Sequence, residues 1–193
     1  MAHGRPPLSH EQSNVIAWQN RLADAARARV GPAGWLLFDT APLMTAVYSE
    51  HYFFSDALTA FATRVQQTFD VTLLMGLDLP WQPDGPWRDG PAVQEAIDTR
   101  LRHMLHTAAI PFQTIYGTGP QRTSAALLCI AQALPADSAA RISLKKRAEI
   151  LDSESTRACF YSKFMPACEA CSDPACEHRL FSQLVAKRNS VRS

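Results

Sequence analysis

The sequence predicts an α/β fold of three layers, in which helices cover both faces of a parallel β-sheet. Two observations predict it. Short apolar runs alternate with longer stretches of helical apolar spacing, and the connections between them are short. The composition agrees, because 47% of the 193 residues are hydrophobic and 19% are charged, as in globular proteins. This length suffices for one domain with a substantial core and a small appendage.

Three short apolar runs are predicted as buried strands: Trp35–Asp39, Asp70–Gly76 and Phe112–Tyr116. Helical spacing of apolar residues predicts helices over residues 15–30, 43–54, 56–69, 93–108 and 121–134. The two glycines and the proline within residues 31–34 are expected to end the first helix. Residues 1–137 are therefore predicted as the main domain, and residues 138–193 as a tail with a basic helix and a cysteine-rich patch.

Charge and hydropathy exclude several classes of function. The net charge is +1, so nothing in it favours a nucleic-acid partner. The N-terminus lacks the apolar stretch of a secretory signal, and no apolar run is long enough to span a bilayer. We therefore expect a cytoplasmic protein without a membrane partner.

Polar residues follow the predicted strands at the edge where parallel sheets bind ligands. Asp39 ends the first run, which suits a magnesium-organising or base residue, although it equally suits a cap for the next helix. Asp78 and the Gly117–Gly119 turn follow the other two runs. This turn allows backbone to approach a ligand, but taken by itself it is better explained as a tight strand-to-helix turn.

The segment after the second run is rich in turn-forming residues and contains Trp81, Asp84 and Arg88. A tryptophan can stack on a base-like ring and an arginine can bind phosphate in a bidentate manner, so the segment suits a lid over a ligand. An ordinary surface loop anchored by tryptophan is the alternative. The phosphate-loop motif G-x-x-x-x-G-K-[ST] occurs nowhere in the sequence.

These features together resemble NadR-type ribosylnicotinamide kinases, within the AAA-like P-loop ATPase domains. The resemblance covers about residues 4–134. It is carried by Phe38-Asp39-Thr40, the stretch Leu43–Phe53, the strand Phe69–Leu74, the segment Asp78–Trp81, Asp84-Gly85 and Arg88, in matching order and spacing.

The resemblance implies a P-loop kinase fold that transfers the γ-phosphate of ATP, with Mg²⁺, to the ribose hydroxyl of a nicotinamide nucleoside in NAD salvage. It implies catalytic roles for Asp39 and Arg88. It places Tyr48, Glu50, Trp81 and Asp84 near the nucleoside-like substrate, and Gly117, Gly119 and Arg122 near the adenine end of the nucleotide.

Two departures from the family pattern weaken the expected activity. Ala41 stands where the family usually has a second acid. The family's initial strand and phosphate loop have no counterpart in this sequence, and they supply most of the stabilisation of phosphoryl transfer. We therefore expect a truncated or degenerate member that is a weak kinase or none. The alternative is a non-catalytic interaction or regulatory module.

The tail contains a cluster of metal-ligand residues. Cys168 and Cys171 form a C-x-x-C pair, and Cys176 and His178 follow closely, with Cys159 upstream as an alternative ligand. Four such donors can enclose a tetrahedral structural Zn²⁺. Reduced surface thiols and a redox-labile pair are the alternatives.

Overall fold

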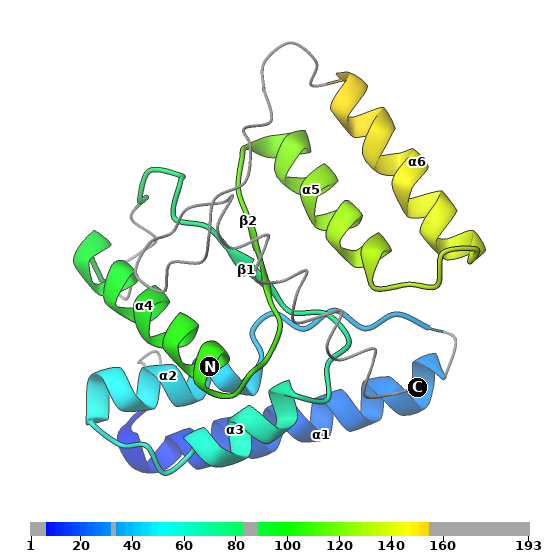
Figure 1. Cartoon of the computed structure of the whole chain (residues 1–193). Helices are drawn as coiled ribbons and strands as arrows, with labels where there is room; N and C mark the ends of the chain where they lie inside the picture. The colour runs from blue at the N-terminus through cyan, green and yellow to red at the C-terminus, as the bar shows by residue number, and fades with distance from the viewer. Residues whose placement is uncertain (1–6, 32–33, 83–88, 155–193) are drawn as a thin grey trace. The chain divides into compact units, whose positions relative to one another are not determined.

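The computed structural model of the chain describes residues 7–31, 34–82 and 89–154. These residues form a mixed α/β structure that is mostly helical and contains a two-stranded parallel sheet (Figure 1). In chain order the elements are the 3-10 helix η1 (Ser9–Glu11), α1 (Gln12–Val30), α2 (Pro42–Phe53), α3 (Thr59–Gln66), β1 (Leu73–Met75), α4 (Pro91–Thr107), β2 (Gln113–Ile115), α5 (Gly119–Gln132) and α6 (Ala139–Glu154).

The chain divides into two compact units, each made of two segments. The first comprises Met1–Phe69 and Gln82–Ala108 and contains η1 and helices α1 to α4. The second comprises Asp70–Trp81 and Ala109–Ser193 and contains both strands with α5 and α6. The predicted boundary between residues 137 and 138 falls between α5 and α6, two helices of the same unit.

Helix α2 is central to the first unit, since it packs against α1, α3 and α4. It begins with Pro42, whose fixed φ and missing N–H suit the first turn of a helix. Its buried side chains include Leu43, Ala46 and Val47. Because small and medium-sized residues occupy this face, neighbouring helices approach it closely, and the unit forms a helical core without a sheet of its own among the described residues.

The second unit is built on the parallel pair β1 and β2, in which Leu73 aligns with Gln113 and Met75 with Ile115. All three residues of β2 are buried, whereas Met75 of β1 is 47% exposed. Helices α5 and α6 lie side by side (Figure 1). Their contact includes a buried hydrogen bond of 3.1 Å from the Ser124 hydroxyl to the backbone carbonyl of Ala148.

The structure confirms the predicted helices and two of the three predicted strands. Helices α1 to α5 cover the five predicted helical ranges with shifts at their ends, and α6 covers the basic helix of the tail. Helix α1 ends at Val30, and the next residue, Gly31, has a φ of 71° and donates its N–H to the Arg27 carbonyl at 3.1 Å. A glycine adopts this left-handed conformation without a steric cost, which explains why the helix ends there.

The predicted strand at Trp35–Asp39 is wrong, because this segment has no strand assignment and no ladder partner among the described residues. Trp35 is 50% exposed and Leu37 is 87% exposed, so the apolar run is not buried on both faces. Phe38 anchors the segment instead, by stacking on Phe69 at 5.0 Å between ring centroids. A run of apolar residues does not make a strand unless another strand offers it backbone hydrogen bonds.

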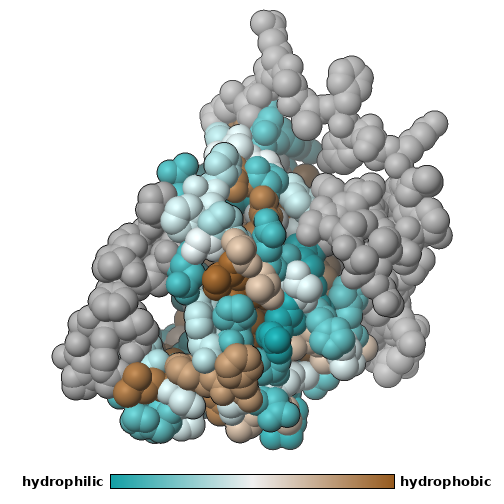
Figure 2. Space-filling model, turned by 90° about the vertical axis from the view of Figure 1, so that its left-hand side faces the viewer, coloured by the Kyte–Doolittle hydropathy of each residue, from teal (hydrophilic) through white to brown (hydrophobic). Residues whose placement is uncertain are grey.

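Large apolar side chains also reach the surface, among hydrophilic ones, on the face shown in Figure 2. Across the described residues, Phe54 at 93% and Leu37 at 87% are the most exposed of them. None of the helices described here has the length and apolar character needed to cross a bilayer.

Candidate functional site

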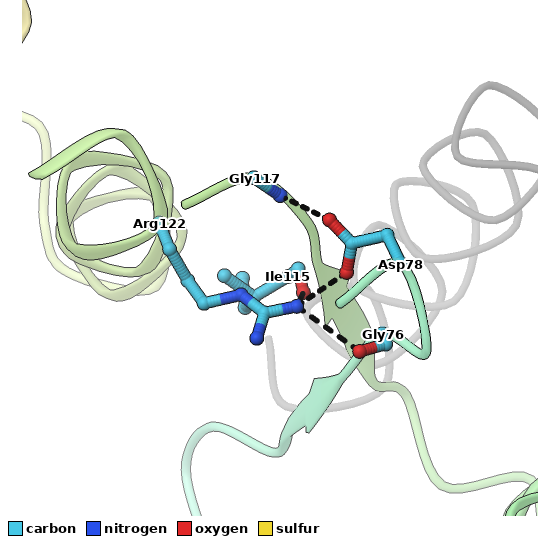
Figure 3. Close-up of polar contacts among 5 residues, drawn as sticks. All are labelled: Gly76, Asp78, Ile115, Gly117 and Arg122. Carbon is cyan, nitrogen blue, oxygen red and sulfur yellow. Dashed lines mark hydrogen bonds and ion pairs between the residues drawn. The ribbon is translucent and has the colours of Figure 1, made fainter. Parts of the chain in front are cut away.

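The carboxyl ends of β1 and β2 carry a polar group of residues, which we call the strand-end cluster: Gly76, Asp78, Ile115, Gly117 and Arg122 (Figure 3). Arg122, on the first turn of α5, forms an ion pair with the Asp78 carboxylate. The same guanidinium nitrogen donates to the backbone carbonyls of Gly76 at 3.0 Å and Ile115 at 3.2 Å. The other Asp78 oxygen accepts the Gly117 N–H at 2.6 Å. A single arginine therefore joins the ends of both strands.

Two glycines give the cluster its shape. A Cβ added to Gly76 would lie 2.5 Å from the Tyr116 ring, a distance that side chains do not tolerate, so glycine permits this close approach. Gly117 has a φ of 97°, which turns its N–H toward Asp78 at low conformational cost. Gly119 follows with a φ of 49° and begins α5. The Gly-Thr-Gly turn thus aims a backbone donor at the edge where parallel sheets bind ligands.

Burial strengthens the interactions of this cluster. The Arg122 side chain is 18% exposed and that of Asp78 is 30% exposed. Charge-assisted hydrogen bonds are stronger than neutral ones, and partial exclusion of water adds to the attraction. The Nε atom of Arg122 is buried and has no hydrogen-bond partner among the described residues. In this arrangement the guanidinium charge is neutralised within the protein.

The first unit holds a second paired acid, in what we call the helix cluster: Glu50 of α2, Thr59 of α3 and Arg100 of α4. Glu50 accepts the Thr59 hydroxyl at 2.6 Å and forms an ion pair of 2.6 Å with Arg100. The Glu50 side chain is 16% exposed, whereas that of Arg100 is 44% exposed. Glu50 was predicted to bind substrate, and in this structure its carboxylate links three helices.

Aromatic side chains line the exposed side of α2. The rings of Tyr48 and Tyr52 lie 6.2 Å apart between centroids and are 39% and 45% exposed. His51 contacts Tyr52 edge-on at 4.8 Å. The Tyr52 hydroxyl donates to the Asp89 carboxylate. Partial burial, together with this acceptor and its charge, raises the pKa of Tyr52 to about 12, so the phenol stays protonated at neutral pH.

Two further predicted site residues belong to neither cluster. Asp39 is exposed, and its carboxylate has no hydrogen bond or ion pair with any described residue. Trp81 is half-buried, and its indole N–H is enclosed without a hydrogen-bond partner within the described segments. Asp39 belongs to the first unit together with Tyr48 and Glu50, whereas Trp81 belongs to the second with Arg122.

The remaining predicted residues lie outside the part of the chain that the structure describes. They are Asp84 and Arg88 of the expected lid, and Cys159, Cys168, Cys171, Cys176 and His178 of the expected zinc site. Within residues 7–31, 34–82 and 89–154, no group of three or more His, Cys, Asp or Glu side chains could hold a metal ion. The zinc site thus stays a prediction.

Reasoning from sequence placed Asp78 at the strand edge but missed that it pairs with Arg122. The signal was present: an acid follows one parallel strand, and a base follows the neighbouring strand in the chain. Because the ends of paired parallel strands meet at one edge, opposite charges there are candidates for an ion pair. No comparable signal links Glu50 to Arg100, which lies on a helix fifty positions later.

Comparison with known proteins gives one match. The sequence model of a family described as an AAA domain matches residues 2–122, which is more than half of the 193 residues. The match extends from the first helical unit through both strands to Arg122. No curated protein and no solved structure matches the chain significantly. On the strength of this family match, the chain is a member of the AAA domain family.

Proposed function

We propose that this chain is an ATP-binding domain of the nucleoside-kinase type, with ribosylnicotinamide as the acceptor. The AAA family match supports nucleotide binding, since P-loop domains of this kind generally bind ATP with Mg²⁺. The narrower choice of a nucleoside acceptor rests on the sequence resemblance around Asp39 and Trp81.

The strand-end cluster is the observation that carries this proposal. Ligands of parallel sheets bind beyond the carboxyl ends of the strands, and Arg122 and the Gly117 N–H lie there. Phosphate oxygens readily accept hydrogen bonds from a guanidinium and from a glycine N–H. In our proposal the nucleotide lies against the Gly117–Gly119 turn and Arg122.

In our proposal the other residues take the roles that the resemblance implies. The resemblance gives Tyr48, Trp81 and Asp84 a role in binding the nucleoside and gives Arg88 a role at the phosphates. Asp84 and Arg88 lie outside the described residues. Mg²⁺ is usually held by one or two carboxylates together with phosphates and water. Asp39 fits this limited requirement, because its exposed carboxylate is not engaged by any described residue. We therefore propose Asp39 as a carboxylate ligand of Mg²⁺, as the resemblance implies.

The same proposal expects little phosphoryl transfer by residues 1–193. Catalysis of this reaction depends on positioned donors around the β- and γ-phosphates, usually with a phosphate-loop lysine. The sequence has no G-x-x-x-x-G-K-[ST] motif, and Ala41 replaces an expected acid. We therefore propose binding of ATP without efficient transfer of its phosphate.

Titration of the purified chain with ATP tests this proposal, with and without Mg²⁺, using calorimetry and thermal unfolding. We expect ATP to raise the unfolding temperature, because a ligand at one hundred times its Kd adds about 2.7 kcal/mol to stability. Asp39→Asn should reduce the contribution of Mg²⁺, whereas the matched control Asp56→Asn, also exposed and in the same unit, should not. No stabilisation by ATP under either condition would refute the proposal.

A non-catalytic interaction module is the second candidate. The observation that favours it is that Glu50 and Arg122 are already paired within the protein. This candidate includes a zinc-stabilised tail that uses Cys168, Cys171, Cys176 and His178. It predicts about one equivalent of zinc by elemental analysis, lost in Cys168→Ser, together with no response to ATP. A zinc content far below one equivalent would contradict the zinc-stabilised tail.

A further inference from the structure

We propose that Asp78 is an internal competitor for the anion site at the strand ends, so that only a multiply charged phosphate group displaces it. The inference rests on the proposed function, because it concerns the regulation of the same site. It goes further by naming the residue that occupies the site and the charge that a ligand needs to displace this residue.

The first step is the geometry of Asp78. Its two carboxylate oxygens bind two different donors, the Gly117 N–H at 2.6 Å and the Arg122 guanidinium (Figure 3). A phosphate would use the same two kinds of donor, one backbone N–H and one guanidinium. Asp78 therefore occupies, with its own negative charge, the donors that the ligand requires.

The second step is that Arg122 does not depend on Asp78 for its position. Its Nη2 atom also donates to the carbonyls of Gly76 and Ile115, at 3.0 Å and 3.2 Å. These backbone acceptors belong to the strand ends and remain when Asp78 moves or is replaced. Release of Asp78 thus leaves a positively charged guanidinium held in place at the edge of the sheet.

The third step is access and competition. Asp78 is more exposed than Arg122, 30% against 18%, so an incoming anion can replace the carboxylate without opening the core. A tethered carboxylate competes as though it were present at millimolar concentration or above. A singly charged anion gains no more from the arginine than Asp78 does, whereas a diphosphate group brings more charge and more acceptor oxygens. The site is therefore selective for a diphosphate or triphosphate group.

The test compares wild type, Asp78→Asn and Asp78→Ser for binding of inorganic pyrophosphate by calorimetry on the full chain, with chloride as the singly charged anion that should not displace Asp78 from the wild type. Both variants remove the charge, and Asp78→Asn keeps an amide oxygen as acceptor for the Gly117 N–H. We expect pyrophosphate to bind at least about tenfold more tightly to the neutral variants, the factor expected when one opposing charge-assisted hydrogen bond is removed. Asp137→Asn is the matched control, because it removes an exposed charge from the same unit.

Equal or weaker pyrophosphate binding by a folded neutral variant would overturn the inference, and so would an equal gain in Asp137→Asn. If neither neutral variant folds, the Gly117 amide resonance of the wild type decides. A shift of this resonance on addition of pyrophosphate supports displacement of Asp78, and its absence contradicts it. The proposed function is tested separately. If the neutral variants bind pyrophosphate more tightly but the protein does not bind ATP, the role of Asp78 is supported and the proposed ATP binding is rejected. If the protein binds ATP with an affinity that Asp78→Asn does not change, ATP binding is supported and the role of Asp78 is rejected.

Discussion

The strand-end cluster and the helix cluster each pair an acid with an arginine, but they hold the arginine differently. Arg122 is anchored by two backbone carbonyls as well as by Asp78 and is 18% exposed. Arg100 has Glu50 as its acceptor and is 44% exposed. Backbone acceptors that lose their donor in a partly buried place remain unsatisfied, whereas a half-exposed side chain finds water. The comparison predicts that the strand-end cluster matters more for stability.

Arg122→Met should give the largest effect. The substitution leaves the Asp78 carboxylate and the carbonyls of Gly76 and Ile115 without their shared donor. Loss of one member of a partly buried ion pair, with unsatisfied acceptors left behind, costs about 2–4 kcal/mol. Urea denaturation measures this loss. Arg147→Met, an exposed residue of α6 in the same unit, should stay within about 0.5 kcal/mol. Equal costs for the two substitutions would show that the strand-end cluster is not a structural anchor.

The thiol of Cys129 reports on the same unit from within α5. It is 8% exposed, and burial raises its pKa to about 11, so it should react slowly with alkylating reagents near neutral pH. Mass spectrometry of digested protein separates its labelling from that of the tail cysteines. Faster labelling in Arg122→Met, and unchanged labelling in Arg147→Met, would link the strand-end cluster to the stability of α5.

The Glu50–Arg100 pair of the helix cluster should give a smaller effect. Because Arg100 is half exposed, solvent screens the attraction, and a double-mutant cycle with Glu50→Gln and Arg100→Met should show a coupling of about 0.5–1 kcal/mol. The exposed pair Asp24–Arg27, with side chains 76% and 44% exposed, is the matched control and should show less. If the control pair shows an equally large coupling energy, burial of Glu50 does not strengthen its ion pair. Burial would then not explain any difference in stability between the helix cluster and the strand-end cluster.

The sequence was sufficient for features that depend on neighbouring residues. Helical spacing located the helices, and Gly31 marked the end of α1 because its backbone conformation is local. The runs around Leu73 and Ile115 were recognised as strands, since the two segments pair with each other. These predictions succeeded because periodicity and turn chemistry express preferences that tertiary packing did not override.

Features that depend on distant partners were not predicted. The run at Trp35–Asp39 has the composition of a strand but no strand to pair with among the described residues. The resemblance gives Glu50 and Tyr48 the same role, yet the Glu50 carboxylate is paired with Arg100, whereas the Tyr48 ring lies beside that of Tyr52. Whether a polar side chain is engaged by the protein depends on which helix packs beside it, and a single sequence does not encode that in any local pattern.

Tyr52 should give the smallest effect on stability, because its hydrogen bond to Asp89 is an exposed contact within the first unit. Its folded pKa of about 12 exceeds the ordinary value of 10 for tyrosine. A raised pKa means that the protonated form is favoured by folding, so the contribution is complete below pH 10 and is lost as pH rises toward 12. Tyr52→Phe should cost only about 0.5 kcal/mol at neutral pH, since the side chain is 45% exposed.

Between about pH 10 and pH 12, the stability of wild type should fall toward that of Tyr52→Phe. Urea denaturation at several pH values, together with the tyrosinate absorbance of both proteins, measures this change. Asp89→Asn keeps a hydrogen-bond acceptor but removes the charge, so the upward pKa shift of Tyr52 should shrink without disappearing, because burial is its largest cause. An unchanged titration in Asp89→Asn would show that the acid contributes nothing to the shift. Burial alone would then explain the raised pKa of Tyr52.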